Sequence, residues 1–104
     1  MINWGRVDEL KADIGAEDFA EVVEIFLEEV EETLGHIEDC ADAAELEGKL
    51  HFLKGSALNL GFREFSDLCG HWEDAAANGA FRETPLPEIK ESYARAKAAF
   101  LAAI

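Results

Sequence analysis

Basic residues are scarce in this chain of 104 residues. Nine Lys and Arg stand against 23 Asp and Glu, which gives a formal net charge of −14. No Lys or Arg occurs from Ala12 to Gly48, where acids are frequent. A protein with this balance is repelled by a phosphate backbone, so we expect no nucleic-acid partner. We interpret the acids as the solvated face of a helix in preference to a docking surface.

Cysteines and long apolar runs are rare as well. Cys40 and Cys69 are the two cysteines, too few for a disulfide framework and compatible with a reducing compartment. No stretch approaches the roughly 20 apolar residues of a membrane-spanning helix, and the first residues lack the basic-then-apolar build of a secretory signal. We therefore expect a cytoplasmic protein that does not enter the membrane, folded as a single domain over residues 1–104.

What the chain does have is helical periodicity from end to end. Apolar residues recur at steps of three and four, and no segment alternates as a strand would. Helices are predicted from Asn3, as a cap, to about Gly15, and over about 16–39, 42–61, 63–78 and 85–104. Four long amphipathic helices with short connections predict an all-α, antiparallel up-down four-helix bundle, with the short N-terminal helix as a cap over one end. The predicted core includes Ile37 and Ile104, and we expect Trp4 and Trp72 in the core or at the cap.

The most informative stretch is residues 51–61, H-F-L-K-G-S-A-L-N-L-G. One apolar stripe, which must face the core, is formed by Leu46, Leu50, Leu53, Ala57 and Leu60. At about 100° per residue, His51 points roughly 140° away from the centre of that stripe and is expected to face outward. An imidazole in water is partly unprotonated near neutral pH, so its free nitrogen can act as a nucleophile.

Two neighbours of His51 suit that chemistry. Lys54, one turn on, can place an ammonium beside an anion held on the ring. Gly55, at i+4, leaves out the side chain that would crowd the ring, although a glycine inside a helix costs about 1 kcal/mol relative to alanine. This cost suggests that another molecule approaches the ring closely.

Residues 51–61 resemble the signature of histidine-containing phosphotransfer (HPt) domains, with the histidine, the lysine, the following glycine and the final leucine-glycine at the expected spacing. The resemblance implies reversible phosphoryl transfer between His51 and an aspartate of a receiver domain, with Lys54 as counter-charge and Gly55 as clearance. The implied partners are receiver domains of response regulators or of a hybrid histidine kinase. No cofactor is expected on this chain, because the magnesium ion would belong to the receiver. With no nucleotide-binding loop visible, we expect a phosphocarrier and not a kinase.

The outward face of the same helix predicts a docking patch. Apolar side chains opposite a core stripe are unusual for a monomer, and the patch is predicted to comprise Gly48, Phe52, Leu58, Phe62 and Arg63. Phe52 could instead be shared with a neighbouring helix.

Two further residues are weaker candidates for the phosphoryl site. The resemblance places Glu73 where some family members carry a glutamine near the ring. A carboxylate there could accept a bond from Nδ1–H of His51, and a surface salt bridge is the alternative. Asn59, two turns beyond His51, could bond near the phosphoryl group, but we favour a solvated polar residue.

Other interpretations of the reactive residues remain. His36, Cys40, Cys69 and His71 could supply zinc ligands, but Cys69 falls on an apolar stripe and His71 should point elsewhere, so no metal site is expected. A hydrolase that releases phosphate from His51 would need a general base, for which Glu73 is the one candidate. An adaptor that only docks receivers is the third possibility, against which the intact His51, Lys54 and Gly55 argue. A monomer is the simplest expectation for a bundle with an open docking face.

Overall fold

The computed structural model describes residues 2–104, which form an all-α fold, as predicted. Its α-helices are α1 (Trp4–Ile14), α2 (Ala16–Gly35), α3 (Ala43–Leu60), α4 (Arg63–Ala75) and α5 (Leu86–Ala103). Short helical turns at Ile37–Asp39, Ala76–Ala80 and Phe81–Glu83 connect them. None of these helices is both long enough and apolar enough to cross a membrane.

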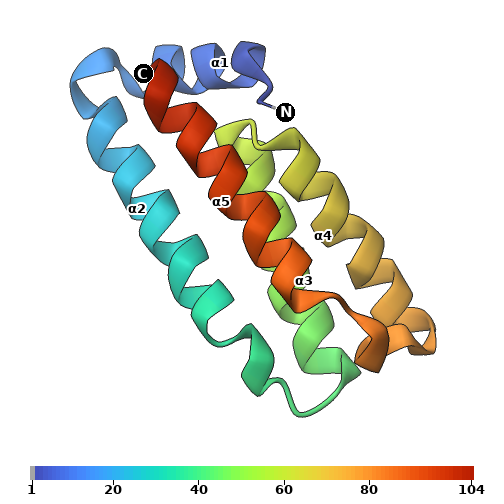
Figure 1. Cartoon of the computed structure of the whole chain (residues 1–104). Helices are drawn as coiled ribbons and strands as arrows, with labels where there is room; N and C mark the ends of the chain where they lie inside the picture. The colour runs from blue at the N-terminus through green and yellow to red at the C-terminus, as the bar shows by residue number, and fades with distance from the viewer. Residues whose placement is uncertain (1) are drawn as a thin grey trace.

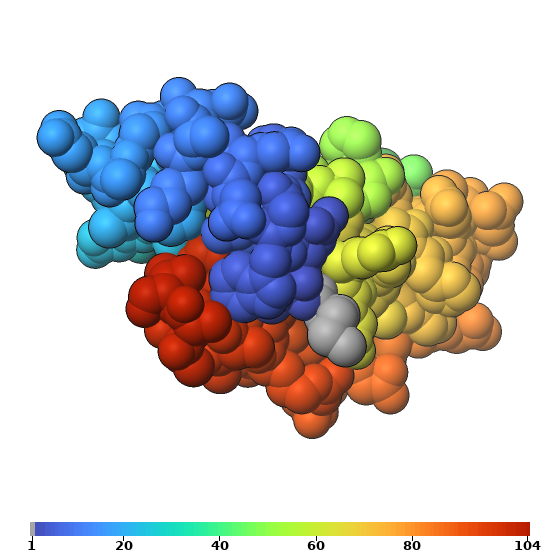
Figure 2. Space-filling model, turned by 90° about the horizontal axis from the view of Figure 1, so that it is seen from above, coloured from blue at the N-terminus to red at the C-terminus, as the bar shows by residue number. Residues whose placement is uncertain are grey.

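The long helices α2 to α5 lie along one axis of a molecule that measures 43 × 21 × 20 Å. Successive helices reverse direction, and α1 crosses one end of the other four (Figure 1). Seen from above, α1 covers this end with α5 on one side and the ends of α3 and α4 on the other (Figure 2). This arrangement agrees with the antiparallel bundle and short N-terminal cap expected from the sequence.

The start of α1 is tied to the turn between α3 and α4. The Asn3 side chain accepts a hydrogen bond from Arg6 N at 3.2 Å and so caps α1, as predicted. Asn3 N donates to Gly61 O at 2.6 Å. Gly61 has φ +76°, and a Cβ atom there would lie 2.5 Å from Asn3 O. This turn therefore requires glycine both for its backbone conformation and for the close approach of α1.

Helix α3 begins at a capping residue, Asp42. The Asp42 side chain accepts from Glu45 N at 2.9 Å, and the Glu45 carboxylate accepts from Ala41 N at 2.6 Å. Such reciprocal bonds satisfy backbone donors that a helix start leaves free. The predicted core stripe is confirmed, since every one of its members is at most 2% exposed: Leu46, Leu50, Leu53, Ala57 and Leu60. Burying this face fixes which face of α3 remains open to solvent.

Phe62 corrects the sequence prediction, which placed it on the docking patch. Its side chain is 1% exposed. The ring packs against Phe100 of α5 in an edge-on arrangement, with centroids 5.4 Å apart. The left-handed turn at Gly61 redirects the chain, so that Phe62 points under α5 and does not continue the outer surface of α3.

Three other expectations change at the ends of helices. Helix α2 stops at Gly35 and not near residue 39, but Ile37 is still 1% exposed because a short 3-10 turn carries it into the core. Ile104 was predicted to be in the core and is 58% exposed, since it follows the last residue of α5. Trp4 is 39% exposed and covers the bundle end by stacking on Phe100, at a centroid distance of 5.9 Å. Trp72 lies half-buried against the core.

Candidate functional site

His51 projects from the exposed face of α3, as its helical phase predicts. Its side chain is 71% exposed. It sits beside Leu50, which is fully buried, so the two residues mark the outer and inner faces of one helical turn. An imidazole on the outer face is accessible to a large partner.

The carboxylate of Glu73, on α4, binds two residues of α3 at once. Its Oε2 lies 2.9 Å from Nδ1 of His51, and its Oε1 lies 2.9 Å from Nζ of Lys54. The Glu73 side chain is 18% exposed, against 34% for that of Lys54. The antiparallel packing of α3 and α4 thus gathers an outward imidazole, an ammonium and a partly buried carboxylate into one cluster.

The bond to Glu73 fixes which nitrogen of a neutral His51 ring carries the proton. An ionised carboxylate only accepts hydrogen bonds, so Nδ1 must be the donor. The lone pair of the neutral ring is then on Nε2. Nε2 is therefore the nitrogen that an electrophile meets.

The cluster favours the ionised form of Glu73. Partial burial by itself would raise the pKa of this carboxyl group. Hydrogen bonds from Lys54 and His51, together with the positive charge of Lys54, outweigh that effect and hold the Glu73 pKa below its ordinary value. Glu73 is therefore a charged acceptor at neutral pH.

This lowered pKa makes the contribution of Glu73 to stability dependent on pH. A carboxyl group whose pKa is lower in the folded state stabilises the fold above its unfolded-state pKa, and the contribution is lost as pH falls through the folded-state value. We expect Glu73→Gln to lower the free energy of unfolding by about 1 kcal/mol near pH ~5.5. The difference from wild type should begin to shrink below pH 4.5, the ordinary pKa of this carboxyl group, and should be lost as pH falls through the lowered folded-state pKa. Urea denaturation across this range measures it.

Glu28→Gln is the matched control, because Glu28 lies on the exposed acidic face of α2. This substitution changes the net charge by the same amount as Glu73→Gln, and the free energy of unfolding should show no comparable loss at pH ~5.5. A Glu73→Gln effect that stayed constant down to about pH 3 would mean that the ionised carboxylate is not what stabilises the cluster.

An open surface surrounds His51 along α3. Gly48 and Gly55 are exposed, and a Cβ atom at either would meet nothing within 4 Å. Phe52 is 40% exposed and Leu58 is 54% exposed. Arg63, at the start of α4, is exposed as well. Of the predicted docking residues, the structure thus keeps these on the surface and removes Phe62.

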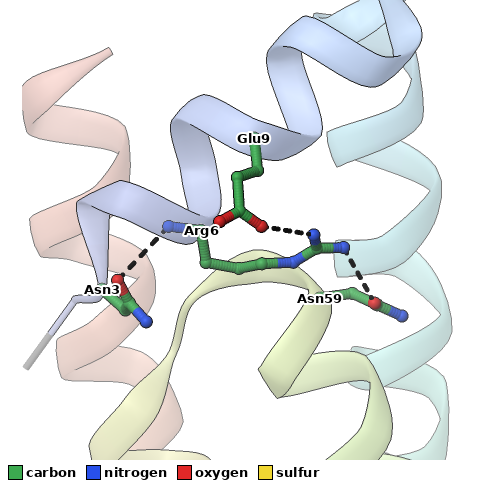
Figure 3. Close-up of polar contacts among 4 residues, drawn as sticks. All are labelled: Asn3, Arg6, Glu9 and Asn59. Carbon is green, nitrogen blue, oxygen red and sulfur yellow. Dashed lines mark hydrogen bonds and ion pairs between the residues drawn. The ribbon is translucent and has the colours of Figure 1, made fainter.

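Asn59 lies at the junction of α1 and α3, away from the ring. Its Oδ1 accepts a bond from Nη2 of Arg6 at 3.3 Å, and Nη1 of Arg6 pairs with Glu9 at 3.3 Å (Figure 3). Two helical turns separate Asn59 from His51, a rise of about 12 Å. Asn59 therefore helps to hold α1 on the bundle and takes no part in the site proposed below.

Ser66 supports the turn of α3 that carries Lys54 and was not identified from the sequence. It is 2% exposed, and its hydroxyl donates to the backbone carbonyl of Lys54 at 3.3 Å. The signal in the sequence was its spacing from Glu73, because positions seven apart share one helix face. The bond joins α4 to the turn of α3 that carries Lys54.

The residues considered as zinc ligands do not assemble. Among residues 2–104, no three His, Cys, Asp or Glu side chains are grouped so that they could hold a metal ion. Cys69 is fully buried, and burial, aided by the charge of Glu73, raises the pKa of its thiol to about 12. His71 stands edge-on to Trp72, with ring centroids 5.0 Å apart.

A surface hollow of about 570 Å³ lies between α2 and α5, and its lining includes none of the residues around His51. Three of its polar side chains already bind one another, since Glu31 accepts from Tyr93 at 2.7 Å and from Lys97 at 2.6 Å. The His51 cluster therefore lies on an open helix face and not in this hollow.

Comparison with known protein families identifies the family to which this chain belongs. The family model described as Hpt domain matches residues 21–99, which include the whole His51 cluster. No curated protein and no solved structure shows a significant match to the chain. Hpt domains transfer phosphoryl groups through a histidine in two-component phosphorelays, interact with receiver domains of response regulators and hybrid kinases, and are carriers rather than kinases. This chain, with its exposed histidine on an all-α scaffold, belongs to the Hpt domain family.

Proposed function

We propose that this protein is a stand-alone cytoplasmic phosphocarrier that holds a phosphoryl group on Nε2 of His51 and passes it between aspartates of two receiver domains. The observation that carries the proposal is the 2.9 Å contact between Nδ1 of the exposed His51 and the Glu73 carboxylate. This contact presents the second ring nitrogen, with its lone pair, to an incoming partner.

The transfer step follows from this arrangement. The lone pair of Nε2 attacks the phosphorus of an aspartyl phosphate, the N–P bond forms as the P–O bond to the aspartate breaks, and the aspartate leaves as a carboxylate. Nδ1 keeps its proton throughout, and the positive charge that develops on the ring is stabilised by Glu73. The reverse sequence delivers the group to a second receiver.

Lys54 and Glu73 have complementary roles in this proposal. The ammonium of Lys54 is held by Glu73 within the same cluster as the ring, which keeps a positive charge close to the position of the incoming phosphoryl group. The magnesium ion that neutralises the other phosphoryl oxygens is expected on the receiver, together with the acidic residues that bind it.

The receiver is proposed to dock on the open face of α3. The two apolar side chains on this face, Phe52 and Leu58, supply contact area, and Gly48 and Gly55 leave room for a flat approach. Arg63 adds a positive charge at the far end of the patch. A monomer is the form in which this face remains open to the receiver.

The experiment is transfer from a phosphorylated receiver to the purified protein. We expect label that is acid-labile and base-stable, as a phosphoramidate is, and located on His51. The label should move on when an unphosphorylated receiver is added. ATP alone should give no label.

The outcomes separate the three candidate functions. Stable label that can be passed on supports the carrier. Rapid release of inorganic phosphate would indicate a hydrolase, and receiver binding with no label would indicate an adaptor. Either of these results contradicts the proposal.

A further inference from the structure

Three positions on one face of α4 contact three different parts of Lys54. The hydroxyl of Ser66 donates to the Lys54 carbonyl at 3.3 Å, and the carboxylate of Glu73 binds the Lys54 ammonium at 2.9 Å. Between them on the same face lies Gly70, opposite the aliphatic stem of Lys54. Residues spaced by four and then three share one side of a helix. Lys54 therefore lies along α4 from its backbone to its charged end.

Of the three positions, Gly70 carries the residue type that is least favourable inside a helix. It lies inside α4, which spans Arg63–Ala75, and its φ is not positive. Any L-residue could adopt this backbone, and alanine would be the better helix former. The backbone conformation thus gives no reason for a glycine here.

The limited space between α4 and the Lys54 side chain does give a reason for glycine at position 70. A Cβ atom at Gly70 would lie 3.2 Å from Cδ of Lys54, which is closer than ordinary van der Waals contact. Every other residue type would push against the Lys54 stem at this point. To relieve this contact the stem must move by a few tenths of an ångström, and that movement shifts the ammonium at its end relative to Glu73.

We propose that Gly70 is a positioning residue for phosphoryl transfer, whose bare α-carbon lets Lys54 cross α4 and bind the carboxylate that also holds His51. The catalytic consequence rests on the function proposed above. The geometric consequence does not, because the link between Lys54 and Glu73 exists in the free protein.

The test is Gly70→Ala, with Gly35→Ala as the matched control. A Cβ atom at Gly35, the last residue of α2, meets nothing within 4 Å. Both variants should fold with a melting temperature at or above that of wild type. Only Gly70→Ala should raise the Glu73 pKa, because burial then acts on a carboxylate that has lost its Lys54 bond. A ¹³C NMR titration of the Glu73 carboxyl carbon measures this. We expect phosphoryl acceptance from a receiver to fall about tenfold in Gly70→Ala.

A double variant tests whether Gly70 acts through Lys54. Lys54→Met removes the ammonium and keeps an unbranched side chain. If the proposal holds, adding Gly70→Ala to Lys54→Met changes neither the Glu73 titration nor the transfer rate any further. Additive effects would overturn the proposal.

Two other results would also overturn it. In the first, Gly70→Ala leaves the Glu73 titration unchanged, which would show that the Lys54 stem yields without losing its bond. In the second, transfer falls while Glu73 titrates as in wild type, which would place Gly70 in the receiver contact. If wild-type protein accepts no phosphoryl group, the proposed function fails, and the Glu73 titration still decides the role of Gly70.

Discussion

Replacing His51 with glutamine is expected to abolish phosphoryl acceptance, with a loss of more than about 100-fold from any receiver donor. Glutamine carries no nitrogen lone pair that can attack phosphorus. Its amide can still donate to Glu73 Oε2, which His51 Nδ1 contacts at 2.9 Å, so the cluster keeps a bonded partner. The side chain is 71% exposed and contributes little packing. The free energy of unfolding should therefore change by less than about 0.5 kcal/mol.

His36→Gln is a close control for this prediction. His36 is also exposed, at 65%, and its Nδ1 also contacts a carboxylate, Asp39 Oδ2 at 3.3 Å. The same substitution at this second bonded histidine should leave transfer at the wild-type rate. The measurements are labelling by a phosphorylated receiver and urea denaturation of both variants. Label that persists in His51→Gln, or a fold that is lost with it, contradicts the assignment.

The parts of this fold that depend on local sequence could be predicted. The α3 stripe follows from apolar spacing alone, and the same phase gives the outward direction of His51. The Asn3 cap depends on a side chain and a backbone donor three residues apart. Such features involve neighbours along the chain, so a single sequence contains the information that they need.

The errors arose where distant segments decide the outcome. Phe62 looked like a continuation of the α3 surface, but its direction is set by the turn at Gly61 and by the space beneath Phe100. Ile104 fits the α5 stripe by spacing, yet α5 ends before it and its side chain stays 58% exposed. Periodicity assigns a residue to a helix face, but it does not show whether a neighbour lies opposite.

The candidate site also contains residues that local spacing identifies and one residue whose role depends on the packing of two helices. His51, Lys54 and Gly55 lie within one turn of helix, and their spacing identified them. The role of Gly70 depends on the path of the Lys54 side chain over α4. Lys54 belongs to α3 and precedes Gly70 by 16 residues in the chain. No pattern within α4 indicates that contact, and only the packing of α3 against α4 reveals it.

Replacing Gly55 with glutamine is expected to make the protein more stable and nearly inactive towards receivers. A Cβ atom at Gly55 meets nothing within 4 Å, so a side chain fits without disturbing the fold. Removing a glycine from the interior of α3 should raise the free energy of unfolding by about 0.5 to 1 kcal/mol. The new side chain lies one turn from His51 and fills the space through which a receiver must approach. We expect transfer from a receiver to fall about 100-fold, since small displacements of reacting groups have large effects on rate.

A small phosphoryl donor separates a steric block from damaged chemistry. Phosphoramidate can deliver its phosphoryl group to Nε2 with release of ammonia, and it needs no docking surface. The Gly55→Gln variant should accept label from phosphoramidate at close to the wild-type rate while it fails with the receiver. Gly35→Gln, which adds the same side chain at an open position on α2, should behave as wild type with both donors. Normal transfer from the receiver to Gly55→Gln would show that the partner does not approach across this glycine, and equal losses with both donors would show that the substitution acts on the ring itself.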